Sequence, residues 1–424
     1  MKFYILLIII ILLVILLSIS KYNTLQQKLF YKCENILNNT ALNNSLEKNN
    51  IVHTTNINDK WDIYIPCGYN FVEDEISRIN PVKIPATSDE NIIDIINNST
   101  NNSTNNSEQI NLNISENTKS NTAIYAIPGC DKLASKNKLW ELLVKRYGVS
   151  RASSIMPMSY LVDSQEDMTN FAELFRKTKL QYRIYILKKN IQRKQGLEII
   201  DCRSNNNNKY SSVSEIIKYA RENEFKVIQT YITSPLLINK RKLNIRLYVL
   251  ILCNQGTNIP TAYIYKQGKC IYTNTEYNSE NSENIESQIT SINLDTNIYN
   301  TNPETLLELG EYIGYNRWNS IWTNICNKLR NIIIAVEPVL CKGQNTQGYN
   351  RFQLFGVDVI ISTDNNSNKK YEPYILEFNK GPDMSFKTDN DEKMKNELQS
   401  DILSLIGFGS NGTHGNSNWE MLIS

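Results

Sequence analysis

Arg351-Phe-Gln-Leu-Phe-Gly-Val-Asp-Val-Ile-Ile361 and, further along, Tyr374-Ile-Leu-Glu-Phe-Asn379 are the two stretches that decide the fold. Both alternate or stay apolar, as strands do. The first carries one acid, Asp358, and the second ends in Glu377-x-Asn379, where side chains at i and i+2 share a face. If the strands are neighbours, three oxygen-bearing side chains meet at one spot, which suits Mg²⁺. The alternative for Asp358 is an acid that caps a turn or pairs with a core arginine.

Composition excludes several classes of function. The chain has 424 residues, 41% hydrophobic content and a formal net charge of +2, so it is long enough for two or three domains. We expect no nucleic-acid partner, because the net charge creates no strong positive field. Only two histidines occur, His53 and His414, so histidine acid–base catalysis and a His-rich zinc site are not expected. The eight cysteines show no C-x-x-C spacing, and we expect them to be reduced, as on the cytosolic side of a membrane.

The N-terminal run of residues 3–19 is uncharged and almost wholly aliphatic. As a helix it would span about 25 Å, at the short end for a bilayer. We expect an uncleaved membrane anchor, with a cleaved signal peptide as the alternative. Lys21, Lys28 and Lys32 follow the run and only Lys2 precedes it. The positive-inside rule therefore predicts a single-pass membrane protein with a cytoplasmic catalytic region.

Composition also divides the remaining chain. The stretch at 85–122 is dominated by Asn, Ser and Thr and is too poor in bulky residues to bury a core, so we predict disorder there. Elsewhere strand-like runs, helical patterns and hairpin signals are mixed, which indicates the α+β class. The predicted units are an anchor at 1–20, a polar stalk at 21–60, a short ordered segment at 61–84, an Asn/Ser-rich insert at 85–122, an N-terminal lobe at 123–180, a larger domain at 181–407 with a polar insert at 274–304, and a tail at 408–424.

A few elements matter for function. A helix is predicted over 136–147 and ends at Gly148, and a second helix is predicted over 318–337. Strand-like residues at 261–265 and 269–273 flank Lys-Gln-Gly and predict a hairpin.

Lys188 lies at a strand end, before a cationic loop that contains Arg193 and Gly196. Such a loop could hold phosphate through its backbone N–H groups and the lysine charge. The alternative is a solvated lysine. A later strand end, Gln229-Thr-Tyr-Ile232, could offer backbone to an adenine edge with Tyr231 and Ile232 beside the ring, or it could be an ordinary sheet strand.

Arg246 lies inside Leu243-Asn-Ile-Arg-Leu-Tyr-Val-Leu-Ile-Leu252, a run that is otherwise nearly all apolar. Burying an unpaired guanidinium is very costly, so Arg246 must face a carboxylate, a phosphate or a cleft. A structural salt bridge to Asp358 or Glu377 remains the alternative.

Four motifs, in order and at compatible spacing, resemble the tubulin–tyrosine ligase-like family: Gln229-Thr-Tyr-Ile-Thr-Ser-Pro-Leu-Leu237, Lys242-Leu-Asn-Ile-Arg-Leu-Tyr-Val249, Phe352-Gln-Leu-Phe-Gly-Val-Asp358 and Ile375-Leu-Glu-Phe-Asn379. The likeness covers about 123–405. It implies an ATP-grasp fold, whose two α+β lobes hold ATP and Mg²⁺ between them, with the ATP-grasp domain at 181–407. It also implies an ATP-dependent ligase: a carboxylate is phosphorylated, and a free amino acid attacks the acyl phosphate. The implied acceptor is a protein, such as tubulin or another acidic tail.

The resemblance assigns a role to each matching residue. Arg246 would be catalytic, holding the γ-phosphate and the acyl phosphate. The implied ATP-binding residues are Lys188, Arg193, Gly196, Gln229, Tyr231, Ile232 and Lys242, and the implied metal ligands are Asp358, Glu377 and Asn379.

Several positions depart from the family pattern. Lys194 stands where the family's phosphate loop has its first Gly, Asn244 where it has Asp, and Ile271 where it has Arg. Gln288-Ile-Thr-Ser291 replaces H-L-T-N. These departures keep open an alternative function, a degenerate nucleotide-binding pseudoenzyme or interaction module with the same fold.

Overall fold

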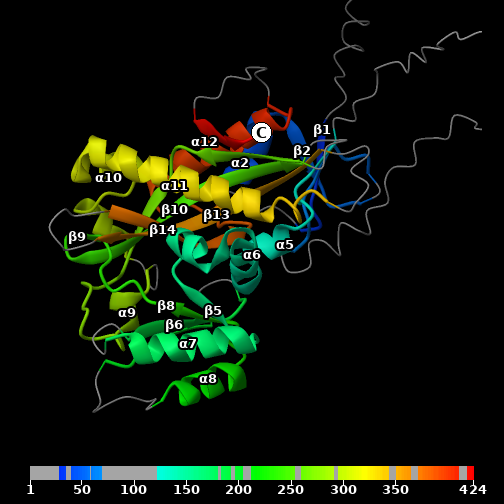
Figure 1. The fold of residues 1–424 in the computed structure, drawn as a ribbon. Coiled ribbons are helices and arrows are strands. Elements are labelled where there is room, and N and C mark those ends of the chain that lie inside the picture. The colour runs from blue at the N-terminus through cyan, green and yellow to red at the C-terminus, as the bar shows by residue number, and fades with distance from the viewer. Residues whose placement is uncertain are drawn as a thin grey trace, which may run out of the picture.

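The computed structural model describes residues 28–34, 40–57, 59–68, 122–179, 183–191, 196–203, 212–253, 259–290, 295–342, 350–363, 371–409 and 418–424. Within these ranges the chain forms two β-sheets with helices packed on them, as Figure 1 shows. The fold is therefore a mixture of helices and sheets, as the sequence predicted.

The larger sheet takes its strands from nearly the whole chain. The strands are β1 (Lys28–Tyr31), β2 (Ile51–Thr54), β3 (Ile63–Tyr64), β4 (Ala123–Ile124), β9 (Leu237–Ile238), β10 (Arg241–Cys253), β11 (Pro260–Tyr265), β12 (Lys269–Tyr272), β13 (Asn350–Thr363), β14 (Tyr371–Lys380) and β15 (Trp419–Ile423). Their order is β15-β11-β10-β13-β4-β3-β1-β2, with β9 and β12 also on β10, and β14 also on β13. The predicted strands that carry Asp358 and Glu377 are thus direct neighbours.

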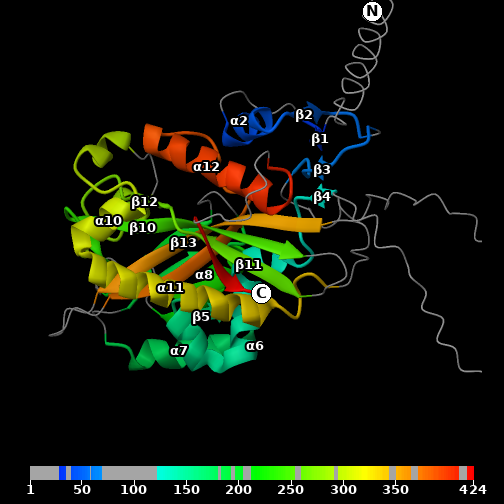
Figure 2. The ribbon, with the colours of Figure 1, turned by 90° about the horizontal axis from the view of Figure 1, so that it is seen from above.

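Helices cover both faces of this sheet, which explains why β10 and β13 read as nearly continuous apolar runs. The helices around it are α2 (Ala41–Lys48), α5 (Cys130–Ala134), α6 (Lys136–Ile155), α10 (Leu306–Ile313), α11 (Tyr315–Val336) and α12 (Asp389–Leu405). Leu247 and Val357 pack in one core with α11 residues such as Leu329, whereas Leu250 packs in another with Leu398 of α12. Figure 2 shows α2 and α12 on one side of the sheet and α11 on the other.

The two predicted helices are present. α6 begins at Lys136 and has non-helical dihedral angles at Gly148, with φ of 76°, where the sequence predicted an end. A second helical stretch then continues to Ile155. α11 covers the predicted 318–337 stripe with Trp318, Ile325 and Leu329 buried.

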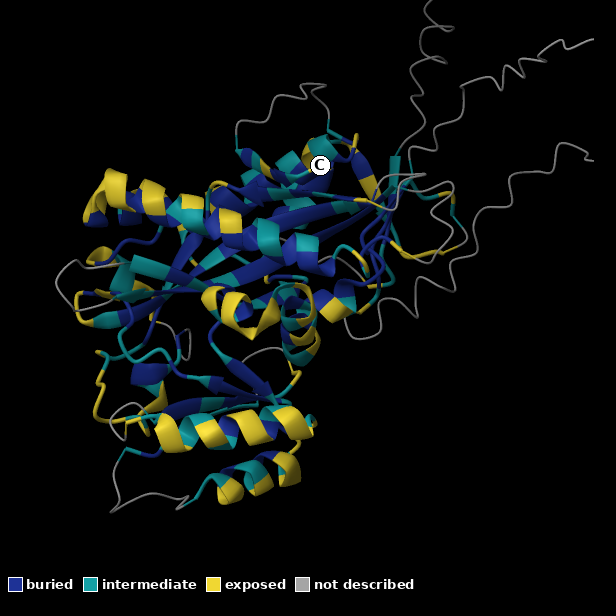
Figure 3. Ribbon diagram, viewed as in Figure 1, coloured by how far each residue is buried: buried dark blue, intermediate teal, exposed yellow. Residues whose placement is uncertain are grey.

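The smaller sheet consists of β5 (Ser159–Leu161), β6 (Ile184–Lys188), β7 (Leu197–Asp201) and β8 (Val227–Thr230), in the order β5-β8-β6-β7. Helices α7 (Gln165–Lys177) and α8 (Val213–Glu222) cover one face, and Figure 3 shows their exposed outer sides. Leu187 and Ile228 point into that helical layer. Since successive strand residues alternate, Lys188 and Gln229 lie on the opposite face. Between β12 and β13 of the larger sheet, the chain also forms α9 (Ile285–Gln288) and a 3₁₀ helix (Thr296–Asn300).

The N- and C-terminal parts differ from the prediction. Where a polar stalk and a short segment were expected, β1, β2 and β3 extend the large sheet and α2 forms between β1 and β2, with Phe30 and Ile63 buried. The predicted tail contains β15, which pairs with β11. In both places the apolar runs are only a few residues long, too short to show a strand period by themselves.

The predicted hairpin is wrong. β11 and β12 both pair with β10, so that Val249 faces Ile264 and Arg246 faces Lys269. β11 and β12 therefore pair, both antiparallel, with two successive parts of β10, and the pairing is interrupted at Gly268. A Cβ atom at Gly268 would lie 2.5 Å from the carbonyl oxygen of Arg246, so glycine permits this close approach.

Single-pass membrane localisation needs correction. None of the helices in the described ranges is both long and apolar enough to traverse a bilayer. Residues 3–19, on which the prediction of an anchor and of a cytoplasmic catalytic region depended, lie outside those ranges. The same is true of the predicted Asn/Ser-rich insert, except for Thr122.

The expectation of reduced cysteines is also corrected. Cys33 is bonded to Cys67, and Cys253 to Cys341. The four remaining cysteines are buried. Cys253 ends β10 and Cys341 follows α11, so the second disulfide ties the central strand to a helix on its face. Cysteine spacing could not reveal these pairings, because the partners are remote in sequence.

Candidate functional site

A row of charged side chains crosses the larger sheet. Arg246 on β10 faces Asp358 on β13, which in turn faces Glu377 on β14. Directly opposed residues on neighbouring strands project from the same face, so the three side chains lie side by side. Lys269 on β12 continues the row opposite Arg246, and its ammonium lies 3.0 Å from Glu304.

The three predicted metal ligands are adjacent. Asn379 donates a hydrogen bond to Glu377 Oε1 at 3.1 Å, and Glu377 faces Asp358 across the ladder. Arg246 binds Asp358 through Nε–Oδ1 at 2.6 Å and Nη2–Oδ2 at 3.1 Å. The structural salt bridge considered for Arg246 therefore exists, and it engages the same carboxylate that the metal interpretation requires. Metal binding itself stays a prediction.

Gly356 is a contributor that the sequence reasoning missed. It faces both Tyr248 and Asn379 in register. A Cβ atom there would lie 3.3 Å from Cδ of Arg246 and 3.0 Å from Cβ of Pro382. Glycine inside a strand often marks such close approach, and this signal was available in the motif Phe-Gly-Val-Asp. Its absent side chain lets the Arg246 side chain lie across β13.

Lys136, the first residue of α6, was missed as well. Its Nζ lies 3.2 Å from Glu377 Oε2 and donates to the carbonyl oxygen of Ile191 at 3.1 Å. Its backbone N–H donates to Asn190 Oδ1 at 3.1 Å. A lysine at a helix N-terminus opposes the helix dipole, which was the available signal. Lys136 links the metal-ligand candidate Glu377 to the β6–β7 connection.

The smaller sheet presents Lys188 on the face turned away from α7 and α8. Burial lowers the pKa of Lys188 to about 8; Glu377 opposes this effect, whereas Lys136 adds to it. These electrostatic interactions show that Lys188 on one sheet lies near Glu377 on the other. Gln229 shares the face of Lys188 and is buried, with Nε2 bonded to Ser159 Oγ at 2.8 Å.

Lys242 and Tyr231 also join the two sheets. Lys242 Nζ donates to the Tyr231 hydroxyl at 2.8 Å and lies 4.4 Å from the ring centroid. Burial and, to a smaller extent, the charge of Lys188 together lower the pKa of Lys242 to about 7. Burial likewise raises the pKa of Tyr231 well above its ordinary value. Both side chains are thus held in a region with little water.

The other predicted nucleotide residues are less informative. Ile232 follows Tyr231 and is partly buried. Gly196 has φ of +76°, and its carbonyl oxygen accepts a hydrogen bond from the Lys189 N–H at 2.9 Å, which closes the β6–β7 connection next to Lys188. Arg193 lies outside the described residues.

The two carboxylates of the row differ in acidity. Burial alone would raise the pKa of Glu377, but Lys136, Lys188 and the Asn379 hydrogen bond lower it to about 2. Burial raises the pKa of Asp358, and neighbouring Glu377 raises it further, although Arg246 opposes both. Two carboxylates that repel one another would be stabilised by a divalent cation between them.

The donor set fits Mg²⁺ bound to a polyphosphate. The described residues contain no group of three or more His, Cys, Asp and Glu side chains that could enclose a metal. Two acids and one amide oxygen would leave coordination positions open, as Mg²⁺ sites that bind phosphate do. The surrounding cations, Lys136, Lys188, Lys242 and Arg246, outnumber the two acids, so the site is positively charged and suits a polyphosphate.

Asn244 and Ile271, which depart from the family pattern, face one another. Asn244 on β10 is the register partner of Ile271 on β12. Asn244 Oδ1 is buried and has no hydrogen-bond partner among the described residues. Asn244 lies two residues from Arg246 and therefore on the same face. The two departures thus form one neutral spot beside the charged row.

Comparison with known proteins finds two kinds of similarity. The model of the tubulin-tyrosine ligase family matches residues 113–412. A Homo sapiens protein named probable tubulin polyglutamylase TTLL2 is 28% identical over 320 residues, covering 69% of this chain and 49% of that protein. A Tetrahymena thermophila protein named probable beta-tubulin polyglutamylase is 26% identical over 304 residues, covering 66% of this chain and 23% of that protein. A second Tetrahymena protein, tubulin glycylase 3C, is 23% identical over 209 residues, covering 46% of this chain and 19% of that protein. The chain therefore spans half or less of the length of these relatives.

Proposed function

The chain belongs to the tubulin-tyrosine ligase family, and from that premise we propose that it is an ATP-dependent ligase that joins an amino acid to a protein acceptor through an amide bond. The observation that carries this proposal is the meeting of two sheets at one charged site. Lys188 and Tyr231 come from the smaller sheet, and Lys242 and Glu377 from the larger one. Such an arrangement fits an ATP-grasp fold, in which a nucleotide lies between two lobes.

The residues of the chain divide the work of phosphoryl transfer. Bound ATP would supply the phosphoryl group that activates a carboxylate of the acceptor. Lys188 and Lys242 would hold phosphate oxygens, while Asp358, Glu377 and Asn379 would hold Mg²⁺. Arg246 would stabilise negative charge at the reacting groups. Phosphoryl transfer depends mainly on such positioning and charge neutralisation.

Lys136 extends the predicted set. Its ammonium contacts Glu377 and the carbonyl oxygen of Ile191. We propose that Lys136 keeps Glu377 ionised for metal binding and orders the β6–β7 connection beside the phosphates. Without that cation, the desolvation of Glu377 would be less well compensated.

The relatives' names support a proposal for the acceptor and the amino acid. Two of the relatives carry the name tubulin polyglutamylase and one the name tubulin glycylase. We propose an acidic tail of tubulin or a similar protein as the acceptor, and glutamate or glycine as the added amino acid.

One observation favours a second candidate function. The neutral pair Asn244 and Ile271 lies next to Arg246, where the family pattern has an acid and an arginine. A chain that kept the nucleotide site but lost groups that serve the reactants would be a nucleotide-binding pseudoenzyme or interaction module.

Amino-acid-dependent ADP release separates the two candidates. The full chain is incubated with ATP, Mg²⁺, an acidic tail peptide, and either labelled glutamate or labelled glycine. A ligase transfers label to the peptide and releases ADP in step, and Arg246→Ala abolishes both. ATP binding without ADP release or label transfer with either amino acid would establish the pseudoenzyme instead.

A further inference from the structure

Residues 273–290, here called the bridging segment, connect the two sheets around Lys242. On the larger sheet, the Thr273 N–H donates to the carbonyl oxygen of Lys242 at 2.9 Å, and the Tyr277 N–H donates to that of Lys240 at 2.8 Å. Apart from Thr273, the bridging segment falls in the predicted polar insert at 274–304, yet backbone hydrogen bonds attach it to β10 and to Lys240 just before that strand.

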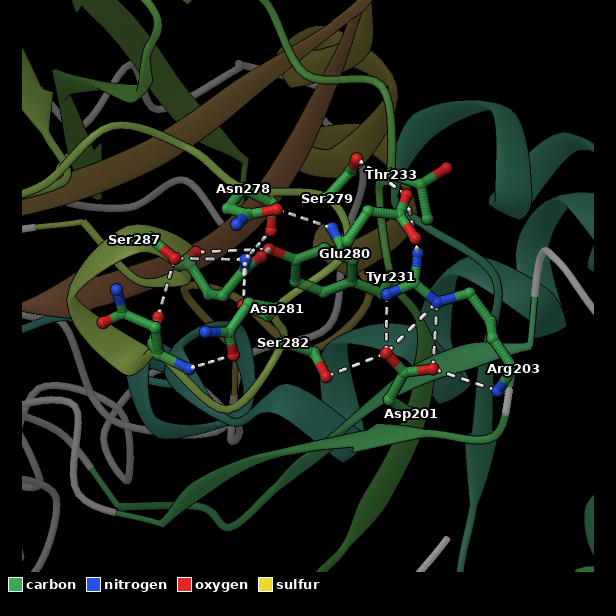
Figure 4. Close-up of polar contacts among 12 residues, drawn as sticks. Asp201, Arg203, Tyr231, Thr233, Asn278, Ser279, Glu280, Asn281, Ser282 and Ser287 are labelled. Carbon is green, nitrogen blue, oxygen red and sulfur yellow. Dashed lines mark hydrogen bonds and ion pairs between the residues drawn. The ribbon is translucent and has the colours of Figure 1, made fainter. Parts of the chain in front are cut away.

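The same segment is bound to the smaller sheet by side chains, as Figure 4 shows. Ser282 Oγ donates to Asp201 Oδ2 at 2.8 Å. Arg203 holds that carboxylate in place through Nη2–Oδ2 at 2.6 Å and Nε–Oδ1 at 2.9 Å. The Tyr277 hydroxyl donates to the carbonyl oxygen of Thr233 at 3.0 Å. The bridging segment is therefore held to both sheets, to β10 through the backbone of Thr273 and to β7 through Ser282.

Gln288 is the buried centre of this arrangement, with 2% of its surface exposed. Its Nε2 donates to the carbonyl oxygens of Asn278 at 2.6 Å and Asn281 at 3.0 Å, which folds the segment back on itself. Its Oε1 accepts from the Tyr231 hydroxyl at 2.7 Å, and its backbone oxygen accepts from Lys242 Nζ at 2.8 Å.

These bonds fix the ammonium of Lys242 from two sides. The Tyr231 oxygen accepts one of its three N–H bonds and the Gln288 carbonyl accepts a second, so among the described residues the third remains for a ligand. A buried ammonium held in this way needs no reorganisation when an anion binds.

We propose that Gln288 is a positioning residue of the nucleotide site: it holds Tyr231 and the bridging segment so that Lys242 faces a bound phosphate, and the Asp201–Ser282 contact supports it. This inference rests on the proposed ATP site. It assigns a role to Gln288, which stands where the family pattern has the first residue of H-L-T-N, and to Ser282 and Asp201, which lie outside the motifs quoted above.

Gln288→Met keeps the length of the side chain and removes its four side-chain hydrogen bonds, the three described above and one from Nε2 to Ser287 Oγ at 3.2 Å. We expect the Kd for ATP, in the presence of Mg²⁺, to rise about tenfold, since losing a buried polar contact costs roughly 1–1.5 kcal/mol. Ser282→Ala should raise the Kd by about threefold, as expected for one supporting hydrogen bond. Ser279→Ala is the matched control, because this serine lies on the same segment and, among the described residues, its hydroxyl donates only to exposed Glu280. Its Kd should equal that of the wild type.

Gln288→Glu tests the positioning role through the pH dependence of ATP affinity, which should not change if Gln288 only stabilises the fold. The titratable groups facing Lys242 are Lys188 on β6 and the Tyr231 hydroxyl, with Tyr277 and Arg203 next to Tyr231. A carboxylate at position 288 would keep Lys242 protonated to higher pH. The midpoint at which ATP affinity falls with rising pH should therefore move upward from about 7.

The outcomes separate the inference from the proposed function. If the wild-type chain fails to bind ATP, the proposed function fails. If the wild type binds ATP while Gln288→Met and Ser282→Ala bind equally well and only their melting temperatures fall, the positioning role is overturned and the ATP site stands. Should Gln288→Met not fold, Ser282→Ala against Ser279→Ala decides: equal Kd values overturn the inference, and weaker binding by Ser282→Ala alone supports it.

Discussion

Arg246 and Asp358 are direct cross-strand partners, and the guanidinium holds the carboxylate through two hydrogen bonds of 2.6 Å and 3.1 Å. This pair joins the candidate catalytic cation to a candidate metal ligand on the neighbouring strand. A fork-to-fork contact of this kind fixes both groups in orientation. The salt bridge and the functional role are therefore compatible, because the pair orients both groups in advance of ligand binding.

Replacing Arg246 should slow turnover more than it weakens nucleotide binding. Arg246→Ala removes a positioned charge, which typically costs ~10²–10³ in rate, or about 3–4 kcal/mol. Arg246→Lys should restore only part of the rate, since an ammonium cannot hold a carboxylate in the same planar way. ADP release measures the rate. Thermal unfolding of Arg246→Ala, Asp358→Asn and the double variant, compared in a double-mutant cycle, measures how much the pair contributes to stability. Undiminished ADP release by folded Arg246→Ala would show that the pair is structural only.

Lys242 should make stability and ATP affinity respond oppositely to pH. Its pKa is about 7 in the folded chain, against an ordinary 10.5. Above pH 7 the unfolded state holds more protons than the folded state, so the free energy of unfolding rises with pH until about 10.5. ATP affinity should fall over the same rise, because the ammonium charge is lost.

Denaturant unfolding and ATP titration between about pH 6 and pH 9 measure the two trends. Lys242→Met is the control, and it should reduce both slopes. A wild-type affinity that does not change over this range would show that Lys242 carries no phosphate contact.

The disulfide from Cys253 to Cys341 should stabilise the larger sheet. It joins two cysteines that are 88 residues apart in sequence. A cross-link that closes a loop of this size contributes roughly 2–4 kcal/mol to the free energy of unfolding. Cys341→Ser should lower the free energy of unfolding by about that amount, and added reductant should then have little further effect from this pair. Cys326→Ala, at a free buried cysteine, is the control and should keep the wild-type response to reductant. Free thiols at both 253 and 341 in peptide mapping would contradict the pairing.

Asn244 and Ile271 should be tested together because they face one another. Asn244→Asp with Ile271→Arg would introduce an opposite-charge pair across β10 and β12, worth about 0.2–1 kcal/mol in a sheet. If the chain is a degenerate ligase, this double variant should show more amino-acid-dependent ADP release than the wild type. Ile271→Arg alone should be less stable than the double variant, since its charge lacks a partner. Equal ADP release by the wild type and the double variant would show that the neutral pair does not limit turnover.

Local pattern was sufficient for part of this site. The strands with Asp358 and Glu377 were predicted because a lone acid in an apolar run and a Glu-x-Asn pair are visible in a few residues. The same holds for Arg246, whose burial demanded a partner. That the two strands are neighbours was a condition of this prediction, and the pairing of β13 with β14 meets it.

Long-range pairing could not be predicted in the same way. β11 and β12 looked like a hairpin because only Lys-Gln-Gly separates them, whereas both in fact pair with β10. Lys136 was missed because its contact with Glu377 spans most of the chain. Cys253 and Cys341 meet only once α11 packs on β10, and the spacing of cysteines carries no record of that packing.

The most direct measurement is an equilibrium titration of the full chain with ATP in the presence and absence of Mg²⁺. The wild type should bind ATP more tightly with Mg²⁺, and Glu377→Gln should lose that dependence, because the carboxylate at 377 is replaced by a neutral amide that binds the ion poorly. Glu222→Gln on α8, where the side chain is 61% exposed and pairs with Lys218, should behave as the wild type. If the wild type binds ATP equally with and without Mg²⁺, or if Glu377→Gln binds MgATP as the wild type does, the two sheets do not form the metal–nucleotide site described above.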